Sequence, residues 1–345
     1  PSIEDKIVRF STKERHQVFI EPCGKNSGEM YLQGLSTSLP EDVQLAFLRT
    51  VPGLEKVEIM RPGYAIEYDC LDPTQLTSGL GVRGVPGLYA AGQICGTSGY
   101  EEAAGQGLIA GVNAARFLEG REEVVLARSD GYIGTLIDDI VTKGTNEPYR
   151  MMTSRSEYRL LLRQDNADAR LMPLGHVIGL VSQQRLDKMQ RDYDQAAEEI
   201  RRLQKTAVSG PALARVLEER GSAPVGQGIL LSDLLRRPEI SYDCLAPLDS
   251  GRPPLSEKVR EQVEIQTKYQ GYIQRELRQV EEHKKLEEKR LPEDLDYLSM
   301  STLRLEARQK LDALRPRSLG QASRISGVSP SDIAALMILL GQRGK

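Results

Sequence analysis

The residues most able to do chemistry in this chain lie between Gly87 and Ala115, in the segment GLYAAGQICGTSGYEEAAGQGLIAGVNAA. A short strand is expected at residues 88–91, and a turn and a helix follow it. Three glycines shape that turn: Gly92, Gly96 and Gly99. Ser98 with Glu101 three residues later fits a capping box, so the helix is predicted to begin near Gly99. Its first-turn N–H groups lack helical partners and would suit a negatively polarised ligand atom.

The predicted helix after this turn is built largely from small residues. Four of them recur at spacings of four and three and would form a face with almost no side chains: Ala103, Gly107, Gly111 and Ala114. Glycine inside a helix costs about 1 kcal/mol against alanine, so close packing must offset that cost. We expect this face to lie against a sheet or a large flat ligand. The Gln93 amide, which both donates and accepts hydrogen bonds, is expected to bind the polar part of that ligand.

Arginines are concentrated in the next part of the chain. Five of them are candidates for binding RNA phosphates: Arg150, Arg155, Arg159, Arg163 and Arg170. Arginine pairs with phosphate and stacks on bases, and the neighbouring Tyr149 and Tyr158 could also stack. If residues 154–163 are helical, Arg155 and Arg159 share a face. Three nearby acids make internal salt bridges an open alternative: Glu157, Asp165 and Asp168. We expect some arginines to pair internally and others to face RNA.

Composition excludes several classes of protein. The 345 residues carry a net charge of −3, so RNA binding must come from a local patch. No apolar run is long enough to cross a membrane, and no signal peptide opens the chain. Scattered cysteines and only 3 histidines argue against a metal site or a disulfide framework, and for the reducing cytoplasm. The cysteines are Cys23, Cys70, Cys95 and Cys244.

Hydrophobic patterning predicts a mixed α/β region followed by helices. Strands are expected at residues 17–21, 29–33, 57–60 and 65–68, and a helix at 40–50. Further helices are expected at residues 128–142, 182–204 and 257–290, the last with an apolar seam of Val259, Val263, Ile273, Leu277 and Val280.

The end of the chain has a strong helix start at residues 329–332, where the sequence is SPSD. Together with residues 318–326 it could pass for a helix-turn-helix. The second helix is mostly apolar and carries few basic residues, whereas a DNA-recognition helix presents polar residues to the bases. We therefore expect these helices to pack or to dock a protein, and we expect no DNA partner.

The glycine-rich segment closely resembles one family, the FAD-dependent tRNA uridine 5-carboxymethylaminomethyl modification enzymes, also called glucose-inhibited division protein A. The resemblance extends along nearly the whole chain. It includes PSIEDKIVRF at 1–10, RPGYAIEYD at 61–69, EPYRMMTSRSEYRLLL at 147–162, DNADARL at 165–171 and QASRISGV at 321–328. One departure is Cys95, which stands where this family usually has Asn or Thr.

The resemblance implies an α/β flavin-binding portion, Rossmann-like and similar to glutathione reductase, followed by an all-α C-terminal region. Residues 1–125 would complete the FAD-binding domain, residues 126–256 would be a helical region with the tRNA-facing arginines, and residues 257–345 would dock a partner. The implied FAD contacts are Gly92, Gln93, Gly96, Gly99, Tyr100 and Glu101, with Pro1, Ser2, Ile3, Glu4, Asp5 and Lys6. No metal site is expected.

The chain has no initiator Met and no G-x-G-x-x-G fingerprint. In the family both that fingerprint and a functional cysteine precede the segment at residues 1–10, so we expect this chain to be the C-terminal half. The implied catalytic residues are therefore not assigned. The resemblance also implies NADH, a folate-derived one-carbon donor, a tRNA-modification GTPase that docks the C-terminal helices, and a homodimer.

Two other hypotheses remain open from the sequence. One is a related folate-dependent tRNA uracil methyltransferase, which resembles this family over the flavin domain but lacks the long helical C-terminal region. The other is a non-enzymatic helical platform that binds RNA or protein.

Overall fold

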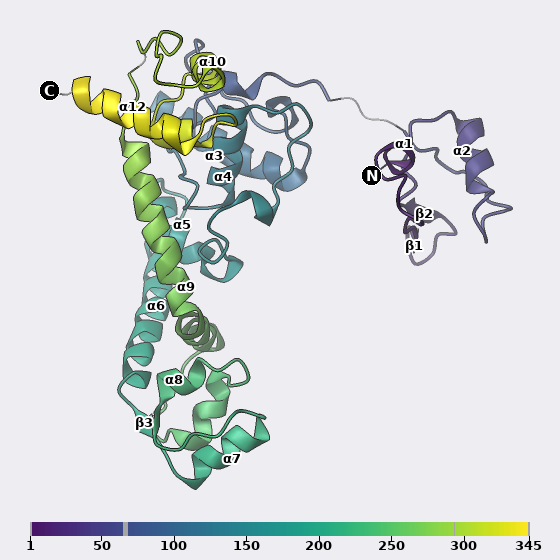
Figure 1. Ribbon diagram of the computed structural model, residues 1–345. Coiled ribbons are helices and arrows are strands. Elements are labelled where there is room, and N and C mark those ends of the chain that lie inside the picture. The colour runs from purple at the N-terminus through teal and green to yellow at the C-terminus, as the bar shows by residue number, and fades with distance from the viewer. Residues whose placement is uncertain (1, 65–67, 293, 344–345) are drawn as a thin grey trace. The chain divides into compact units, whose positions relative to one another are not determined.

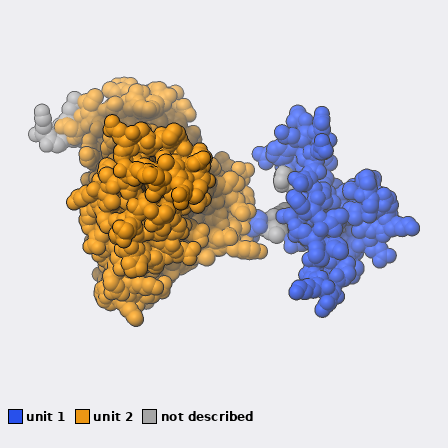
Figure 2. All heavy atoms as spheres, turned by 90° about the horizontal axis from the view of Figure 1, so that it is seen from below, with its two compact units in different colours: residues 1–69 blue, residues 70–345 orange. Residues whose placement is uncertain are grey.

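The structure is a computed structural model that describes residues 2–64, 68–292 and 294–343. The chain forms two units, residues 1–69 and residues 70–345, which Figure 2 distinguishes by colour. The unit boundary falls inside the predicted first domain of residues 1–125.

The first unit contains two short helices and a hairpin. Helix α1 (Ile3–Val8) begins at the N-cap Ser2, whose hydroxyl accepts a hydrogen bond from the Asp5 amide. Strands β1 (Phe19–Pro22) and β2 (Met30–Gln33) pair antiparallel, and α2 (Glu41–Leu48) follows. These elements confirm the predictions near residues 17–21, 29–33 and 40–50. The predicted strand at 57–60 is wrong, and the one at 65–68 includes residues outside the described ranges.

The second unit begins with the glycine-rich turn and two helices, α3 (Tyr100–Leu118) and α4 (Tyr132–Lys143). The strand predicted at 88–91 is reduced to a single bridge between Tyr89 and Gly81. A buried cluster that includes Ile109, Ile137 and Ile140 joins α3 to α4. Short 3-10 turns lie at Pro73–Gln75, Gln93–Cys95, Thr153–Arg155 and Gln164–Asn166, and α5 spans Ala167–Val177.

Two long helices, α6 (Gln183–Leu203) and α9 (Glu257–Glu288), run side by side (Figure 1). Both were predicted, and serine N-caps begin them. Val259 and Val263 are fully buried, Ile273 and Val280 are half-buried and Leu277 is 49% exposed, so the predicted apolar seam of α9 is only partly covered in its second half. Between the two helices lie β3 (Ala207–Val208), α7 (Pro211–Glu219), β4 (Ile229–Leu230), α8 (Leu231–Leu235) and a 3-10 helix (Tyr242–Leu248).

The C-terminal helices α10 (Leu305–Leu314), α11 (Leu319–Arg324) and α12 (Pro330–Arg343) form their own core. The predicted start of α12 is confirmed as a reciprocal cap. Ser329 Oγ accepts a hydrogen bond from the Asp332 amide, and Asp332 Oδ2 accepts one from the Ser329 amide at 2.9 Å. Most apolar side chains of this region belong to that core or pack against it.

Candidate functional site

The turn at residues 92–96 has a backbone that favours glycine. Gly92 has φ of +85° and Gly96 has φ of +79°, both in the left-handed region. The Gly92 amide donates to Gln106 Oε1 at 2.6 Å, and Thr97 Oγ1 donates to the Gly92 carbonyl at 3.2 Å. Gln106 in α3 thus holds the turn, while Gln93 projects to the surface.

The start of α3 differs from the predicted capping box. Its N-cap is Gly99, no side chain caps it, and the Ser98–Glu101 pairing is therefore wrong. The buried carboxylate is that of the next residue, Glu102, which sequence reasoning missed. A Cβ on Gly99 would lie 1.7 Å from Glu102 Oε2, so only glycine leaves room for that carboxylate. Its position three residues after Gly99 is the signal that could have identified it.

The small-residue face of α3 is not packed by the described residues. A Cβ on Gly107 or Gly111 would have no other atom within 4 Å. The helix instead buries a face that includes Gln106 and Asn113. Asn113 ties that face to the neighbouring loops, since its amide donates to the carbonyls of Gly79 and Val124, each at 2.9 Å. Among the described residues no sheet packs on this face, and its packing against a flat ligand stays a prediction.

The glycine turn fits the polar part of a dinucleotide such as FAD. The first turn of α3 has no side-chain cap, and Gln93 is exposed beside it. Gln106 Nε2 is a buried amide donor that has no hydrogen-bond partner among the described residues. Tyr100 is 92% exposed, which leaves a free ring at the helix start. These polar groups suit the hydrogen-bonding part of such a ligand, and the Glu102 carboxylate lies at the same helix start.

A backbone ladder joins this turn to the arginine-rich segment. The Tyr149 amide donates to the Gly96 carbonyl at 2.8 Å, and the Ser98 amide donates to the Tyr149 carbonyl at 3.3 Å. The Met151 amide donates to Glu102 Oε1 at 2.7 Å. Residues 149–151 therefore lie directly beside the candidate cofactor turn, although they are about 50 residues away in sequence.

A buried ionic cluster holds the arginine-rich segment, residues 150–170, in place. The Arg128 guanidinium contacts Asp138 at 3.0 Å, Asp139 at 2.8 Å and Glu157 at 3.0 Å. Burial alone would raise the pKa of Asp139, but the Lys143 hydrogen bond and the Arg128 charge outweigh it and lower that pKa. Burial and the Asp139 charge raise the pKa of Tyr149, whose hydroxyl donates to Asp139 at 2.8 Å. Asp139 therefore stays ionised and Tyr149 stays neutral at neutral pH.

Three of the five predicted RNA-binding arginines reach solvent. Arg159 is exposed and has no ion pair or hydrogen bond with the described residues. The Arg155 guanidinium lies 4.2 Å from the Tyr149 ring centre and also remains exposed. Arg150 is exposed, and its Nε lies 3.9 Å from Glu102. Residues 156–163 are not helical, so the condition on which Arg155 and Arg159 would share a helical face is not met.

The other two arginines are held internally. Arg163 pairs with Asp165 at 2.9 Å. Arg170 donates to Asn166 Oδ1 and to the Arg163 carbonyl, each at 3.0 Å. The two tyrosines named with them, Tyr149 and Tyr158, are buried and cannot stack on bases. The internal pairing left open by the sequence therefore occurs for Arg163 and Arg170, and RNA contact by the three exposed arginines stays a prediction.

The predicted contacts at the start of the chain are used within the first unit. Glu4 accepts hydrogen bonds from Thr37 Oγ1 at 2.6 Å and from the Ser38 amide at 2.9 Å. The Lys6 ammonium donates to the Gly34 carbonyl. Ser2 and Asp5 form the cap of α1, where Ile3 is the first residue, and Pro1 lies outside the described residues. The charged groups of Glu4 and Lys6 therefore stabilise the unit itself.

The thiol nearest the turn is that of Cys95. Cys95 is buried in the cluster beneath the turn, and this burial raises the pKa of its thiol to about 11. Within the described residues no group of histidine, cysteine and acidic side chains is arranged to hold a metal ion. No helix of the described part is long and apolar enough to cross a membrane.

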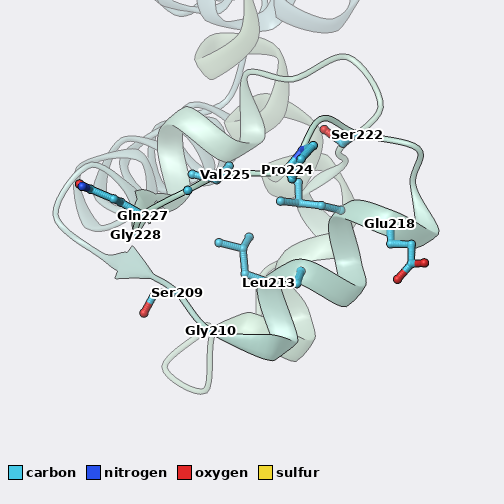
Figure 3. A pocket seen from close by; sticks show the side chains of 12 residues that line it. Ser209, Gly210, Leu213, Glu218, Ser222, Pro224, Val225, Gln227 and Gly228 are labelled. Carbon is cyan, nitrogen blue, oxygen red and sulfur yellow. The ribbon is translucent and has the colours of Figure 1, made fainter.

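A cavity of about 540 Å³ lies elsewhere, between α7 and the loop at residues 222–228 (Figure 3). Leu213 and Val225 contribute apolar walls, and Ser209 and Gln227 lie at its edge. None of its 12 lining residues is basic. It therefore does not suit an anionic dinucleotide or a nucleic acid, and the glycine turn remains the candidate cofactor site.

Comparison with known proteins supports the sequence resemblance. Three family models match: "Glucose inhibited division protein A" over residues 1–122, and the C-terminal helical domain and helical bundle of "tRNA modifying enzyme MnmG/GidA" over residues 183–277 and 279–345. A solved structure of GidA from Aquifex aeolicus aligns with 99% of this chain and 54% of its own, at 45% identity and a TM-score of 0.84.

Two relatives carry the name tRNA uridine 5-carboxymethylaminomethyl modification enzyme MnmG. The one from Caldicellulosiruptor saccharolyticus is 58% identical over 100% of this chain and 55% of its own length. The one from Bacillus mycoides is 56% identical over 99% of this chain and 54% of its own length. The chain thus spans about half the length of the curated relatives it matches. From these matches along its whole length, the chain belongs to the MnmG/GidA family of tRNA-modifying enzymes.

Proposed function

We propose that this chain supplies the C-terminal half of a flavoprotein that, with a GTPase partner, builds a carboxymethylaminomethyl or aminomethyl group on C5 of the wobble uridine of certain tRNAs. The names of its relatives support this substrate and product. The two matched helical domains favour it over the folate-dependent uracil methyltransferase, which lacks such a region.

The observation that carries the proposal is the ladder between the glycine turn and the arginine-rich segment. The bond from the Tyr149 amide to the Gly96 carbonyl places Arg150 beside the residues proposed to bind FAD. A base that reacts at a flavin must be held close to it, and unpaired nucleotides are bound by arginines. One structural element can therefore hold the cofactor on one side and the tRNA on the other.

The chain's own residues have separate tasks in this proposal. Gln93 and the first turn of α3 bind the polar edge of FAD, and Gln106 keeps the turn in its left-handed form. Bound FAD would supply the redox chemistry. Arg150, Arg155 and Arg159 bind tRNA phosphates, while the Arg128 cluster beneath them keeps their backbone fixed.

Other parts of the proposal follow from the family resemblance. NADH would reduce the flavin, a folate-derived unit would supply the carbon, and the enzyme would work in the cytoplasm as a homodimer. Exposed apolar residues near the end of the chain support a docking surface for the GTPase. Leu305 is 62% exposed and Ile338 is 63% exposed, whereas Leu311 and Leu336 are buried.

The test is to express the full-length protein in a bacterium that lacks its own family member and to analyse tRNA nucleosides by mass spectrometry. We expect restored wobble-uridine modification, and a loss of it for Arg159→Glu. The control Arg191→Glu reverses another exposed arginine, on α6, and should retain modification. Appearance of 5-methyluridine instead would favour the methyltransferase, and an unchanged nucleoside profile would favour the non-enzymatic platform.

A further inference from the structure

The arginine-rich segment continues along one face of helix α9. The amides of Leu160 and Leu161 donate to the Glu276 carboxylate at 3.3 and 3.0 Å. Farther along, Gln262 Nε2 donates to Asp165 Oδ2 at 2.8 Å. The segment therefore runs antiparallel to α9 and places Arg159 next to the middle of this helix.

That part of α9 has an open strip beside the segment. Tyr272 lies one turn before Glu276 and is 58% exposed. Arg275 follows at three residues and Gln279 at seven, so the three side chains neighbour one another on the helix surface. All three are exposed, and Tyr272 and Arg275 have no hydrogen bond or ion pair with the described residues.

The charge beside this strip is positive. The carboxylate of Glu276 is satisfied by two backbone amides. Arg159 on the segment and Arg275 on the helix have no acidic partner in the described structure. An exposed tyrosine one helical turn from an unpaired arginine, with Arg159 on the adjoining segment, has the composition of a surface that binds unpaired nucleotides, where aromatic rings stack on bases and cations contact phosphates. It also supplies the exposed aromatic ring that the buried Tyr149 and Tyr158 cannot provide.

We propose that Tyr272, Arg275 and Gln279 of α9 extend the RNA-binding surface and bind unpaired nucleotides of the tRNA. Tyr272 stacks on a base, and Arg275 contacts a phosphate. This inference rests on the proposed function, because it takes the segment with Arg150, Arg155 and Arg159 as the RNA-facing surface. It adds a second element, from a helix more than 100 residues away in sequence.

The test measures binding of an unmodified anticodon stem-loop to the full-length protein by fluorescence anisotropy at several salt concentrations. Tyr272→Leu should weaken binding about tenfold, and Tyr272→Phe should retain it, because stacking needs the ring and not the hydroxyl. Arg275→Gln should lower the log–log salt slope by about 0.7. Thermal melting should be unchanged, because both side chains are exposed.

Arg278→Gln is the matched control. Arg278 lies on the same helix and is exposed, but it points away from the face that carries Glu276. Its Nε donates to the Gln274 carbonyl at 3.4 Å. It should leave affinity and salt slope unchanged. A fully paired RNA duplex should bind the parent and Tyr272→Leu equally well, since its bases are not free to stack.

Several results would overturn the inference. If Arg159→Gln weakens RNA binding but Tyr272→Leu and Arg275→Gln do not, the α9 strip is not part of the surface, while the proposed function stands. If none of these variants changes RNA binding, the RNA surface of the proposed function fails as well. Loss of GTPase capture by Tyr272→Leu with unchanged RNA binding would assign the strip to a protein partner instead.

Discussion

Arg324 in α11 and Asp138 in α4 are 186 residues apart in sequence, yet Arg324 Nη2 donates to Asp138 Oδ1 at 2.9 Å. The other oxygen of Asp138 contacts Arg128 at 3.0 Å. One carboxylate is therefore shared by the C-terminal helices and by the cluster beneath the arginine-rich segment. Burial would lower the pKa of Arg324, but Asp138 and Glu287 raise it, so its charge is permanent.

Breaking this link should destabilise the second unit. Arg324→Gln removes one cation from a mostly buried cluster and should lower the free energy of unfolding by about 3 kcal/mol. Asp138→Asn should have a similar effect, and the double variant should cost less than the sum of the two. Urea unfolding followed by circular dichroism measures all three. Strictly additive losses would show that the two side chains do not interact.

Substitution of Gly99, the N-cap of α3, and of Gly107, inside α3, should change stability in opposite directions. Gly99→Ala would displace the Glu102 carboxylate and leave the Met151 amide without its acceptor, at a cost of about 1–3 kcal/mol. Gly107→Ala meets no atom within 4 Å and should stabilise the 345-residue chain by about 1 kcal/mol. Thermal unfolding of both variants checks the opposite signs. Equal effects would contradict the assigned role of Glu102.

Arg159 and Arg163 are expected to separate RNA binding from stability. Arg159→Glu should reduce tRNA affinity and the salt slope without changing the unfolding temperature, because its side chain is free. Arg163→Glu should lower the unfolding temperature, because Arg163 pairs with Asp165 and a glutamate would repel it. Filter binding and differential scanning fluorimetry on both variants provide the comparison. The reverse pattern would show that the structural roles are exchanged.

The parts of this fold that sequence reasoning predicts depend on local signals. The serine caps and regular patterns of α6 and α9 lie within each helix, as does the reciprocal cap of Ser329 and Asp332. The fate of each arginine depends instead on distant residues. Arg163 pairs with Asp165, which is close in sequence. Glu157, by contrast, pairs with Arg128, an arginine about 30 residues away that was not predicted as a candidate from the sequence.

The same limit applies to the candidate site. The glycines of the turn were identifiable because a left-handed backbone favours that residue. The capping box was predicted with Ser98 as its first residue, but the N-cap is Gly99. This shift of one residue makes Glu102, and not Glu101, the buried carboxylate. Pairing of Tyr149 with Gly96 could not be predicted, because nothing in either local sequence encodes contact with the other.

Glu4 should titrate far below an ordinary glutamate. The Thr37 hydroxyl, followed by the backbone amides of Glu4 and Ser38, lowers its pKa from 4.5 to about 2. Because the folded pKa is the lower one, this carboxylate stabilises the first unit above pH 4.5, and that contribution is lost as pH falls toward 2. Carbon-detected NMR titration measures the value, and Thr37→Val should raise it. A pKa near 4.5 in the parent would contradict the bonds assigned to Glu4.

Ile338 and Leu336 test whether the end of the chain docks the GTPase. Both lie in α12, but Ile338 is 63% exposed and Leu336 is 1% exposed. Deleting the helices after Pro316 would not test docking, because Leu319 and Leu336 belong to the core of this region.

Ile338→Ser should leave folding intact and weaken capture of the GTPase, as removal of an exposed apolar contact does. Leu336→Ser should lower the unfolding free energy by about 3 kcal/mol. Calorimetric titration of the full-length protein with the GTPase, alongside thermal melting, separates the two effects. Parental GTPase affinity in Ile338→Ser would place the docking surface elsewhere.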